Sequence, residues 1–202
     1  MARAVQKRTL ETRAKLFAAA TSIIDERGFE AMRVEEVALK AGVAKGTFFA
    51  HFRDKDALMD QIIGARINAH LDELETVSPQ TVAEMADALT PLCEFMTAER
   101  YVFDVIMRHS GAAAIEEIGA IAETFGRMVE IFESWLGARP FRCDIDAALQ
   151  AEGVHAFLLQ AMAVKFCALH NAVSIRDRLG PYLQAWLSPG SARSANAPAG
   201  PA

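Results

Sequence analysis

The sequence lacks the motifs by which most enzymes and metal proteins are recognised. It has no G-x-S-x-G, no P-loop and no G-x-G-x-x-G, and its five histidines show no metal-ligand spacing. The three cysteines (Cys93, Cys143 and Cys167) lie 50 and 24 positions apart, which indicates free thiols in a reducing cytoplasm. We therefore expect a protein that is not an enzyme and that holds no metal and no cofactor.

Long apolar runs and strand-like alternation are also missing. The longest apolar stretch, Gly153 to Val164, has 12 residues, whereas a membrane-spanning helix needs about 20. The first residues are basic but lack the apolar segment of a secretory signal. We therefore expect an all-α, cytoplasmic protein that does not enter a membrane.

The C-terminal part of the chain has few basic residues for its acidic ones, because the basic residues are concentrated near the N-terminus. Residues 1–55 hold 11 Lys and Arg against 7 Asp and Glu, and residues 56–202 hold 10 against 19, within a net charge of −5. This asymmetry suggests that only the N-terminal region meets a polyanion. Arg3, Lys7, Arg8 and Arg13 fit either a flexible basic arm on DNA or a solvated tail, and the sequence leaves both open.

Apolar residues recur at helical spacing through nearly the whole chain, which predicts about nine helices. Three are expected in the first 52 residues, over about 9–27, 33–41 and 44–52, and a long fourth helix begins at residue 54 or 55. Further helices are expected near 79–97, 99–109, 113–137, 145–170 and 174–187. Ser78 and Pro79 suggest the N-cap and first residue of the fifth helix, and Pro91 and Pro181 should kink or split their helices. The last 15 residues have no Leu, Ile, Val or aromatic residue, so a disordered tail is expected.

The second and third helices, joined by a tight turn at Gly42-Val43, form a helix-turn-helix. Such a turn needs a residue without Cβ, which accounts for Gly42. The second helix of the unit enters the major groove of DNA with its N-terminal residues foremost. There Gly46 lets the backbone come close to DNA, and the helix N-terminus favours phosphate. Phe48 and Phe52, four residues apart, are expected to face inward against the first and fourth helices.

Residues 9–63 resemble the N-terminal domain of the TetR family of bacterial transcriptional regulators. The run GFEAMRVEEVALKAGVAKGTFFAHFRDKDAL follows that family's pattern without a gap: Gly-Phe, an acidic second helix, Ala-Gly-Val, Lys-Gly-Thr, aromatic-x-His-Phe and Lys-x-x-Leu. The resemblance implies a basic arm over residues 1–8 and a helix-turn-helix DNA-binding domain over 9–54. A helical ligand-binding and dimerisation domain over 55–187 and a tail over 188–202 complete the expected organisation.

The resemblance also implies which residues meet DNA. The positions are Arg33, Ala44, Lys45, Gly46, Thr47, Phe49, His51 and Lys55. Within this set, Lys45 to Thr47 would meet bases and backbone, and His51 and Lys55 would meet phosphates. Arg33, Ala44 and Phe49 stand where the family usually has threonine, serine and tyrosine. Each departure removes a neutral hydrogen bond of roughly 0.5–1.5 kcal/mol, although the Arg33 guanidinium could restore one contact as a charged donor.

Aromatic and methionine residues recur at helical spacing in the second domain. Most of them are expected to be core, but such residues on converging helices also line apolar cavities. In the TetR family a cavity of this kind binds a small inducer. The candidate lining residues are Phe95, Arg100, Phe103, Met107, Phe125, Met128, Phe132 and His155.

Residues 145–187 resemble the family's dimerisation hairpin, so a homodimer is expected. Small and apolar residues, Ala151, Leu158 and Leu183 among them, are expected to pack across its two-fold axis. We therefore expect a ligand-responsive repressor that binds a pseudo-palindromic operator on double-stranded DNA and is released by a small, apolar or aromatic effector. Two alternatives stay open: a small-molecule- or protein-binding module that kept the fold without regulating DNA, and an enzyme built on a helical bundle.

Overall fold

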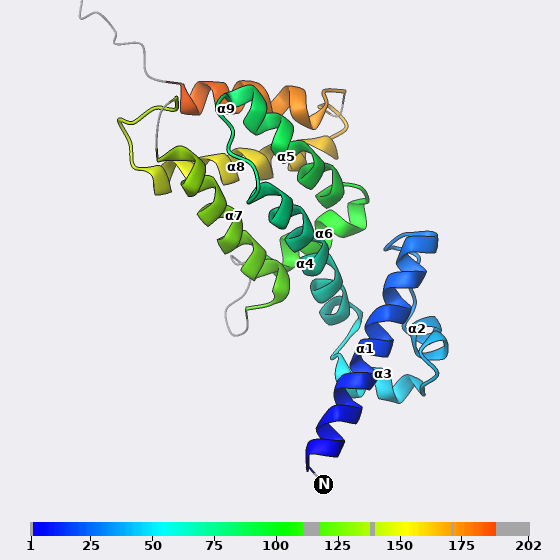
Figure 1. Cartoon of the computed structure of the whole chain (residues 1–202). Coiled ribbons are helices and arrows are strands. Elements are labelled where there is room, and N and C mark those ends of the chain that lie inside the picture. Colours follow the sequence, from blue (N-terminus) through cyan, green and yellow to red (C-terminus); the bar gives the residue numbers. More distant parts are fainter. Residues whose placement is uncertain (1, 111–117, 138–139, 171, 189–202) are drawn as a thin grey trace, which may run out of the picture.

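The computed structural model describes residues 2–110, 118–137, 140–170 and 172–188. These residues form nine helices and contain no strand, which confirms the all-α fold. The helices are α1 (Ala2–Arg27), α2 (Val34–Lys40), α3 (Lys45–His51), α4 (Lys55–Leu74), α5 (Val82–Met96), α6 (Arg100–His109), α7 (Ala120–Leu136), α8 (Ala147–Lys165) and α9 (Ile175–Leu187). Helices α1–α3 form one group, here called the head, and α4 leads from it into a larger group, α4–α9, here called the body (Figure 1).

The head folds around the apolar face of α1 that the spacing predicted. Leu16 and Ala20 are fully buried, and Ile23 and Ile24 are each 3 % exposed. The helix ends at Gly28, whose φ of +85° is the left-handed conformation of a C-cap and whose N–H donates to the Ile24 carbonyl at 2.7 Å. Helix α1 begins at Ala2, so residues 2–8 continue it instead of forming the irregular arm that was expected.

In the body, α4 packs on α7, α7 on α8, and both α8 and α5 on α9. The buried apolar residues form one cluster that runs from the head through α4 into the body. Head and body therefore share a continuous core along α4. The division into a DNA-binding domain that ends at residue 54 and a second domain that begins at residue 55 stays a proposal. None of the helices within the described ranges is long and apolar enough to cross a membrane.

Several helix boundaries differ from those expected. Helix α5 begins at Val82, with Thr81 as its N-cap: the Glu84 N–H donates to Thr81 Oγ1 at 3.1 Å, and the Glu84 carboxylate accepts from the Gln80 N–H at 2.6 Å. The assignment of Ser78 and Pro79 to this helix start is therefore wrong. Pro91 and Pro181 lie inside helices that continue past them, so neither splits its helix.

Helix α7 begins at Ala120 because a side chain from α4 caps it. The Asp60 carboxylate, which is 7 % exposed, accepts hydrogen bonds from the N–H groups of Ala120 and Ile121 at 2.9 and 3.1 Å. Residues 118 and 119 precede the helix, and most of the earlier residues assigned to it (113–117) lie outside the described ranges. The same holds for the expected tail, of which only Ser188 is described.

Candidate nucleic-acid interface

The turn between α2 and α3 has the geometry that the helix-turn-helix requires. Gly42 adopts a φ of +71°, which is costly for any residue with a Cβ, and the Val43 N–H donates to the Ala38 carbonyl at 3.0 Å. Phe48 is fully buried and Phe52 is 3 % exposed, so both face the core of the head as expected. The opposite face of α3 is left exposed.

That exposed face carries most of the residues expected to meet DNA. Lys45 and Gly46 are exposed and Thr47 is partly exposed. Phe49 is 48 % exposed, and its ring packs edge-to-face with the Phe48 ring, with the ring centres 5.3 Å apart. A Cβ built on Gly46 would meet no atom within 4 Å. Nothing in the described residues therefore requires glycine at position 46, although glycine weakens a helix.

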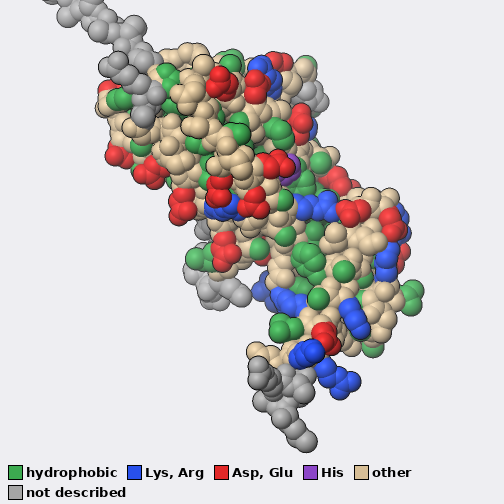
Figure 2. All heavy atoms as spheres, viewed as in Figure 1, with side chains coloured by type: hydrophobic (Ala, Val, Ile, Leu, Met, Phe, Trp, Pro, Cys, Tyr) green, Lys and Arg blue, Asp and Glu red, His purple; other side chains and the backbone are tan. Residues whose placement is uncertain are grey.

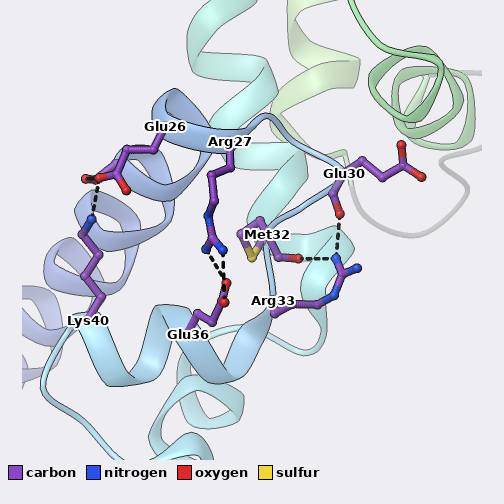
Figure 3. A network of polar contacts seen from close by, with 8 residues as sticks. Glu26, Arg27, Glu30, Met32, Arg33, Glu36 and Lys40 are labelled. Carbon is purple, nitrogen blue, oxygen red and sulfur yellow. Dashed lines mark hydrogen bonds and ion pairs between the residues drawn. The ribbon is translucent and has the colours of Figure 1, made fainter.

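Lys45 and Arg33 are both engaged within the head. The Lys45 ammonium lies 2.6 Å from the Glu35 carboxylate, and its hydrogen bond holds the pKa of Glu35 below the ordinary value. The Arg33 guanidinium donates to the backbone carbonyls of Glu30 at 2.7 Å and Met32 at 3.2 Å (Figure 3). Arg33 is the N-cap of α2 but makes no side-chain capping bond, and Ala44 has none at the start of α3.

Exposed ion pairs hold α2 against α1. Arg27 contacts Glu36 through both of its terminal nitrogens, at 3.2 and 2.5 Å, and Lys40 contacts Glu26 at 2.8 Å (Figure 3). These basic and acidic side chains therefore pair with each other and help to fix the angle between the two helices. Figure 2 nevertheless shows several Lys and Arg side chains at the free end of the head, whereas Asp and Glu side chains dominate the visible face of the body.

Arg13 has a role that the sequence did not suggest. It is partly buried rather than part of a free basic arm. Its guanidinium donates to the His51 carbonyl at 2.8 Å and lies 4.4 Å from the centre of the Phe52 ring. Arg13 therefore supports the end of α3 from behind, at a carbonyl that the helix itself leaves without a donor.

Lys55 lies at the junction of head and body. Its ammonium is 4.5 Å from the centre of the Tyr101 ring on α6, and burial, with the charge of Arg33, lowers its pKa. Next to it, Asp56 accepts hydrogen bonds from Tyr101 at 3.3 Å and from Arg108 at 2.9 Å. The start of α4 is therefore tied to α6, and Lys55 is less free to reach a phosphate than an ordinary surface lysine.

The junction has a second contact, made by Glu99, the N-cap of α6. Its carboxylate accepts hydrogen bonds from the N–H groups of Phe29 and Glu30 at 2.9 and 3.0 Å. These two amides belong to the loop that joins α1 to α2. Glu99 makes no side-chain capping bond to its own helix, so both of these hydrogen bonds join it to the head.

The eight residues expected to line an effector cavity include two groups whose contacts the structure shows directly. Arg100 and Phe103 are together at the start of α6, where the Phe103 ring lies 5.4 Å from Phe166 and the Arg100 guanidinium lies 5.3 Å from Phe166. Phe125 and His155 meet between α7 and α8, with ring centres 5.1 Å apart.

Of the other four expected lining residues, Phe95 lies on α5 and Met107 on α6, and Met128 and Phe132 lie on α7, three and seven residues after Phe125. The Phe95 ring contacts Phe29 and His70, Met107 is 41 % exposed, and Met128 and Phe132 are fully buried. A groove of about 360 Å³ contains none of the eight and belongs instead to α1 and α4. It is lined by Leu10, Arg13, Ala14, Phe17, Ala18 and Gln61.

His155 differs from the other expected lining residues because it has an unused polar atom. Its Nε2 is buried and has no hydrogen-bond partner among the described residues, and burial lowers its pKa. Buried polar atoms are usually satisfied. The neutral imidazole therefore retains the capacity to bind a further polar group.

Comparisons with known proteins agree with this geometry. Residues 16–62 match the family described as bacterial regulatory proteins, tetR family. The HTH-type transcriptional regulator YvdT of Bacillus subtilis (strain 168) is 27 % identical over 124 residues, which cover 60 % of this chain and 61 % of that protein. The HTH-type transcriptional repressor KstR2 of Rhodococcus jostii (strain RHA1) is 28 % identical over 151 residues, 68 % of this chain and 71 % of that protein.

Among solved structures, the TetR-family repressor FadR of Thermus thermophilus, in complex with lauroyl-CoA, has the same fold. The TM-score is 0.63 at 18 % identity, and the match covers 93 % of this chain and 100 % of that one. A helix-turn-helix head joined to a helical body is the arrangement that this chain shares with that repressor. Residues 16–62 therefore resemble the TetR family of bacterial transcriptional regulators in sequence, and the whole chain is similar in fold to a repressor of that family.

Proposed function

We propose that the protein is a cytoplasmic repressor that binds a pseudo-palindromic operator as a homodimer and leaves it when a small effector binds to the body. The name of the Rhodococcus relative, a transcriptional repressor, supports this direction of control. A two-fold dimer brings two copies of α3 to two half-sites separated by about one helical turn of DNA or a multiple of it.

The observation that carries the proposal is the exposed N-terminal part of α3. Glycine at position 46 has no intramolecular reason, because a Cβ there would meet nothing within 4 Å. An open backbone with Lys45 and Thr47 on either side suits close approach to a DNA groove and its phosphates. Arg13 and the buried Phe48 and Phe52 would hold α3 rigid while it docks.

The homodimer is proposed to use α8 and α9, but without three of the residues first expected there. Ala151, Leu158 and Leu183 are all fully buried within one chain, so they cannot reach a partner. The exposed positions of α8 recur every three or four residues and form a single stripe. They are Leu149, Glu152, Ala156, Gln160 and Ala163. Two alanines in this stripe would let a second helix come close, and Leu149, which is 51 % exposed, would supply apolar contact.

An effector would release DNA by favouring a body conformation with another separation of the heads. For strong release its affinities for the two conformations must differ by several kcal/mol. Phe125 and His155 between α7 and α8, and Arg100 and Phe103 at the start of α6, are the expected lining residues that the proposal retains. The two groups supply aromatic surface together with a neutral and a charged polar group.

Fluorescence anisotropy tests the DNA-binding part of the proposal. The wild type, Lys45→Ala and Arg176→Ala are titrated onto the intergenic DNA upstream of the protein's own gene and onto a scrambled duplex, at two salt concentrations. Arg176 is an exposed, ion-paired cation on α9, so its loss changes the net charge equally but far from α3.

The wild type should prefer the upstream DNA with one dimer per site. Lys45→Ala should weaken that binding about tenfold, and if its ammonium meets a phosphate the salt slope should fall by about one unit. Arg176→Ala should match the wild type. Equal affinity of all three variants, or no binding to any duplex in a random-library selection, would contradict DNA binding through α3 and favour a ligand- or protein-binding module.

A further inference from the structure

The body holds a lysine whose positive charge has no carboxylate partner. Lys165 is the last residue of α8 and is partly buried. Its ammonium donates to the Thr97 hydroxyl at 2.9 Å, and that hydroxyl, which is 1 % exposed, donates to the Cys93 carbonyl at 2.7 Å. Among the described residues no Asp or Glu lies within 4.0 Å of Lys165, whereas most arginines of the body pair with a carboxylate.

The position of this lysine is not explained by its own helix. A cation at a helix C-terminus is favoured by the helix dipole. The Lys165 ammonium, however, is turned toward Thr97 at the end of α5, where its one hydrogen-bond partner among the described residues is an uncharged hydroxyl. Partial burial of a cation without a counter-ion is unfavourable. A site that retains such a cation is suited to a ligand that brings the missing negative charge.

Two aromatic rings and a second cation meet at the residue that follows Lys165 in the chain. The next residue, Phe166, has its ring 5.4 Å from Phe103 and 5.3 Å from the Arg100 guanidinium. Arg100 is 64 % exposed along its side chain, so the group can be approached from solvent, and it shares its charge with Asp104 at 2.9 Å. Arg100 thus has a carboxylate partner, whereas no carboxylate among the described residues pairs with Lys165, and the two phenylalanines form an apolar contact at the end of the same helix.

The start of α6 adds to the positive character of this region. Arg100 is the first residue of this ten-residue helix, whose N-terminus carries partial positive charge. The N-cap residue, Glu99, makes no side-chain capping bond to this helix, because its carboxylate accepts from Phe29 and Glu30 in the head. An anion bound at Lys165 would therefore lie beside the helix end that contacts the head.

We propose that Lys165, Thr97 and Arg100 form a subsite for the carboxylate of an apolar effector, with Phe103 and Phe166 against its hydrocarbon part. The inference rests on the proposed ligand-responsive function and defines its effector class as a fatty or aromatic carboxylate. Lys165 supplies the charge, the Thr97 hydroxyl orients the ammonium, and Arg100 closes the solvent side. A neutral phenol or alcohol of the same shape leaves the ammonium unpaired and binds more weakly.

Isothermal titration calorimetry with matched probe pairs tests the subsite on the full-length protein. Decanoate is compared with decanol, and 1-naphthoate with 1-naphthol, so that one pair represents fatty and the other aromatic carboxylates. The variants are Lys165→Met, which keeps the length of the side chain without its charge, and Lys7→Met, a control that removes the same charge from α1, where the Lys7 side chain is 79 % exposed.

The wild type should bind at least one carboxylate about tenfold or more tightly than its neutral partner. Lys165→Met should bring that ratio close to one and should keep or raise the melting temperature without ligand. The control, Lys7→Met, should keep the wild-type ratio. If Lys165→Met does not fold, Arg100→Leu, at an exposed position, should reduce the ratio. Neutral probes that bind as well as carboxylates, a ratio unchanged in Lys165→Met, or no carboxylate with a Kd below about 1 mM overturns the subsite.

Operator binding in the same samples separates this inference from the proposed function. Carboxylates that bind through Lys165 but leave the DNA complex intact support the subsite and contradict the effector role. DNA release by neutral compounds alone supports a ligand-responsive repressor and contradicts the subsite.

Discussion

Replacing Gly46 by alanine should separate the stability of the head from its affinity for DNA. A Cβ at this position would meet no atom within 4 Å, and Gly46 is not among the glycines with positive φ, so alanine fits without strain. Glycine costs a helix interior about 0.8–1 kcal/mol relative to alanine. Because Gly46 is the second residue of α3, we expect roughly half of that to be recovered, which raises the melting temperature by about 1–2 °C.

On DNA the same methyl group would enter the space into which the backbone of α3 is expected to dock. We expect each head to lose about tenfold in affinity, or about 1.4 kcal/mol, and a dimer that uses two heads to lose about a hundredfold. Circular dichroism and fluorescence anisotropy with the selected operator measure the two effects on one sample.

Gly126→Ala is the matched control, because Gly126 is an exposed glycine in α7 whose Cβ would also meet nothing within 4 Å. It should stabilise the protein and leave DNA binding unchanged. If Gly46→Ala is more stable than the wild type and binds the operator with undiminished affinity, then close approach of the α3 backbone to DNA is refuted.

Glu99→Ala should lower the melting temperature by about 2–8 °C, because two charge-assisted hydrogen bonds of a partly exposed carboxylate are worth about 1–2 kcal/mol together. It should also speed hydrogen exchange at the Phe29 and Glu30 amides, whereas Glu94→Ala, at an exposed position of α5, should change neither. Burial lowers the pKa of His155 in the folded protein. As the pH falls through about 6.5, the His155 imidazole is therefore protonated in the unfolded chain before it is protonated in the folded protein, and the free energy of unfolding decreases. Melting temperatures from pH 7.5 to 5.5 should decline less in His155→Phe than in the wild type, and parallel curves would show that His155 does not contribute. Burial raises the pKa of Cys93 to about 12, so iodoacetamide at pH 8 should label the exposed Cys143 in the folded protein but Cys93 only in urea, as peptide mass mapping would show.

Local sequence signals were sufficient for the head. Gly28 and Gly42 are required by positive φ, and the four-residue spacing of Phe48 and Phe52 places both on the buried face of a short helix. Each of these signals depends on a few neighbouring residues, which is why spacing alone located the turn and both helices. The start of α5 was also encoded locally, since Thr81-x-x-Glu84 is a capping-box sequence. We placed the helix start three residues too early because Pro79 also suits the first position of a helix.

Contacts between distant residues were not predictable in the same way. Arg13 belongs to a run of basic residues and supports α3 only because the fold brings His51, 38 positions away, to its guanidinium. Asp60 caps the N-terminus of α7 although it lies 60 positions before Ala120 in the chain. The expected effector residues were chosen by type and spacing, and their common role stays a prediction, because helical spacing fixes the face of a residue but not the partner of that face.

The first residues of α6 connect the two parts of the molecule that the proposed function must couple. Glu99 contacts the α1–α2 loop, Arg100 contacts the Phe166 ring at the end of α8, and Tyr101 contacts Lys55 and Asp56 at the start of α4. The Glu99 hydrogen bonds are 2.9 and 3.0 Å long, so a shift of α6 by about 1 Å would lengthen them beyond hydrogen-bonding range. A ligand that draws Arg100 toward Lys165 therefore acts on the same backbone that positions the head. Because the core is continuous along α4, the head would respond as a unit rather than by local loosening.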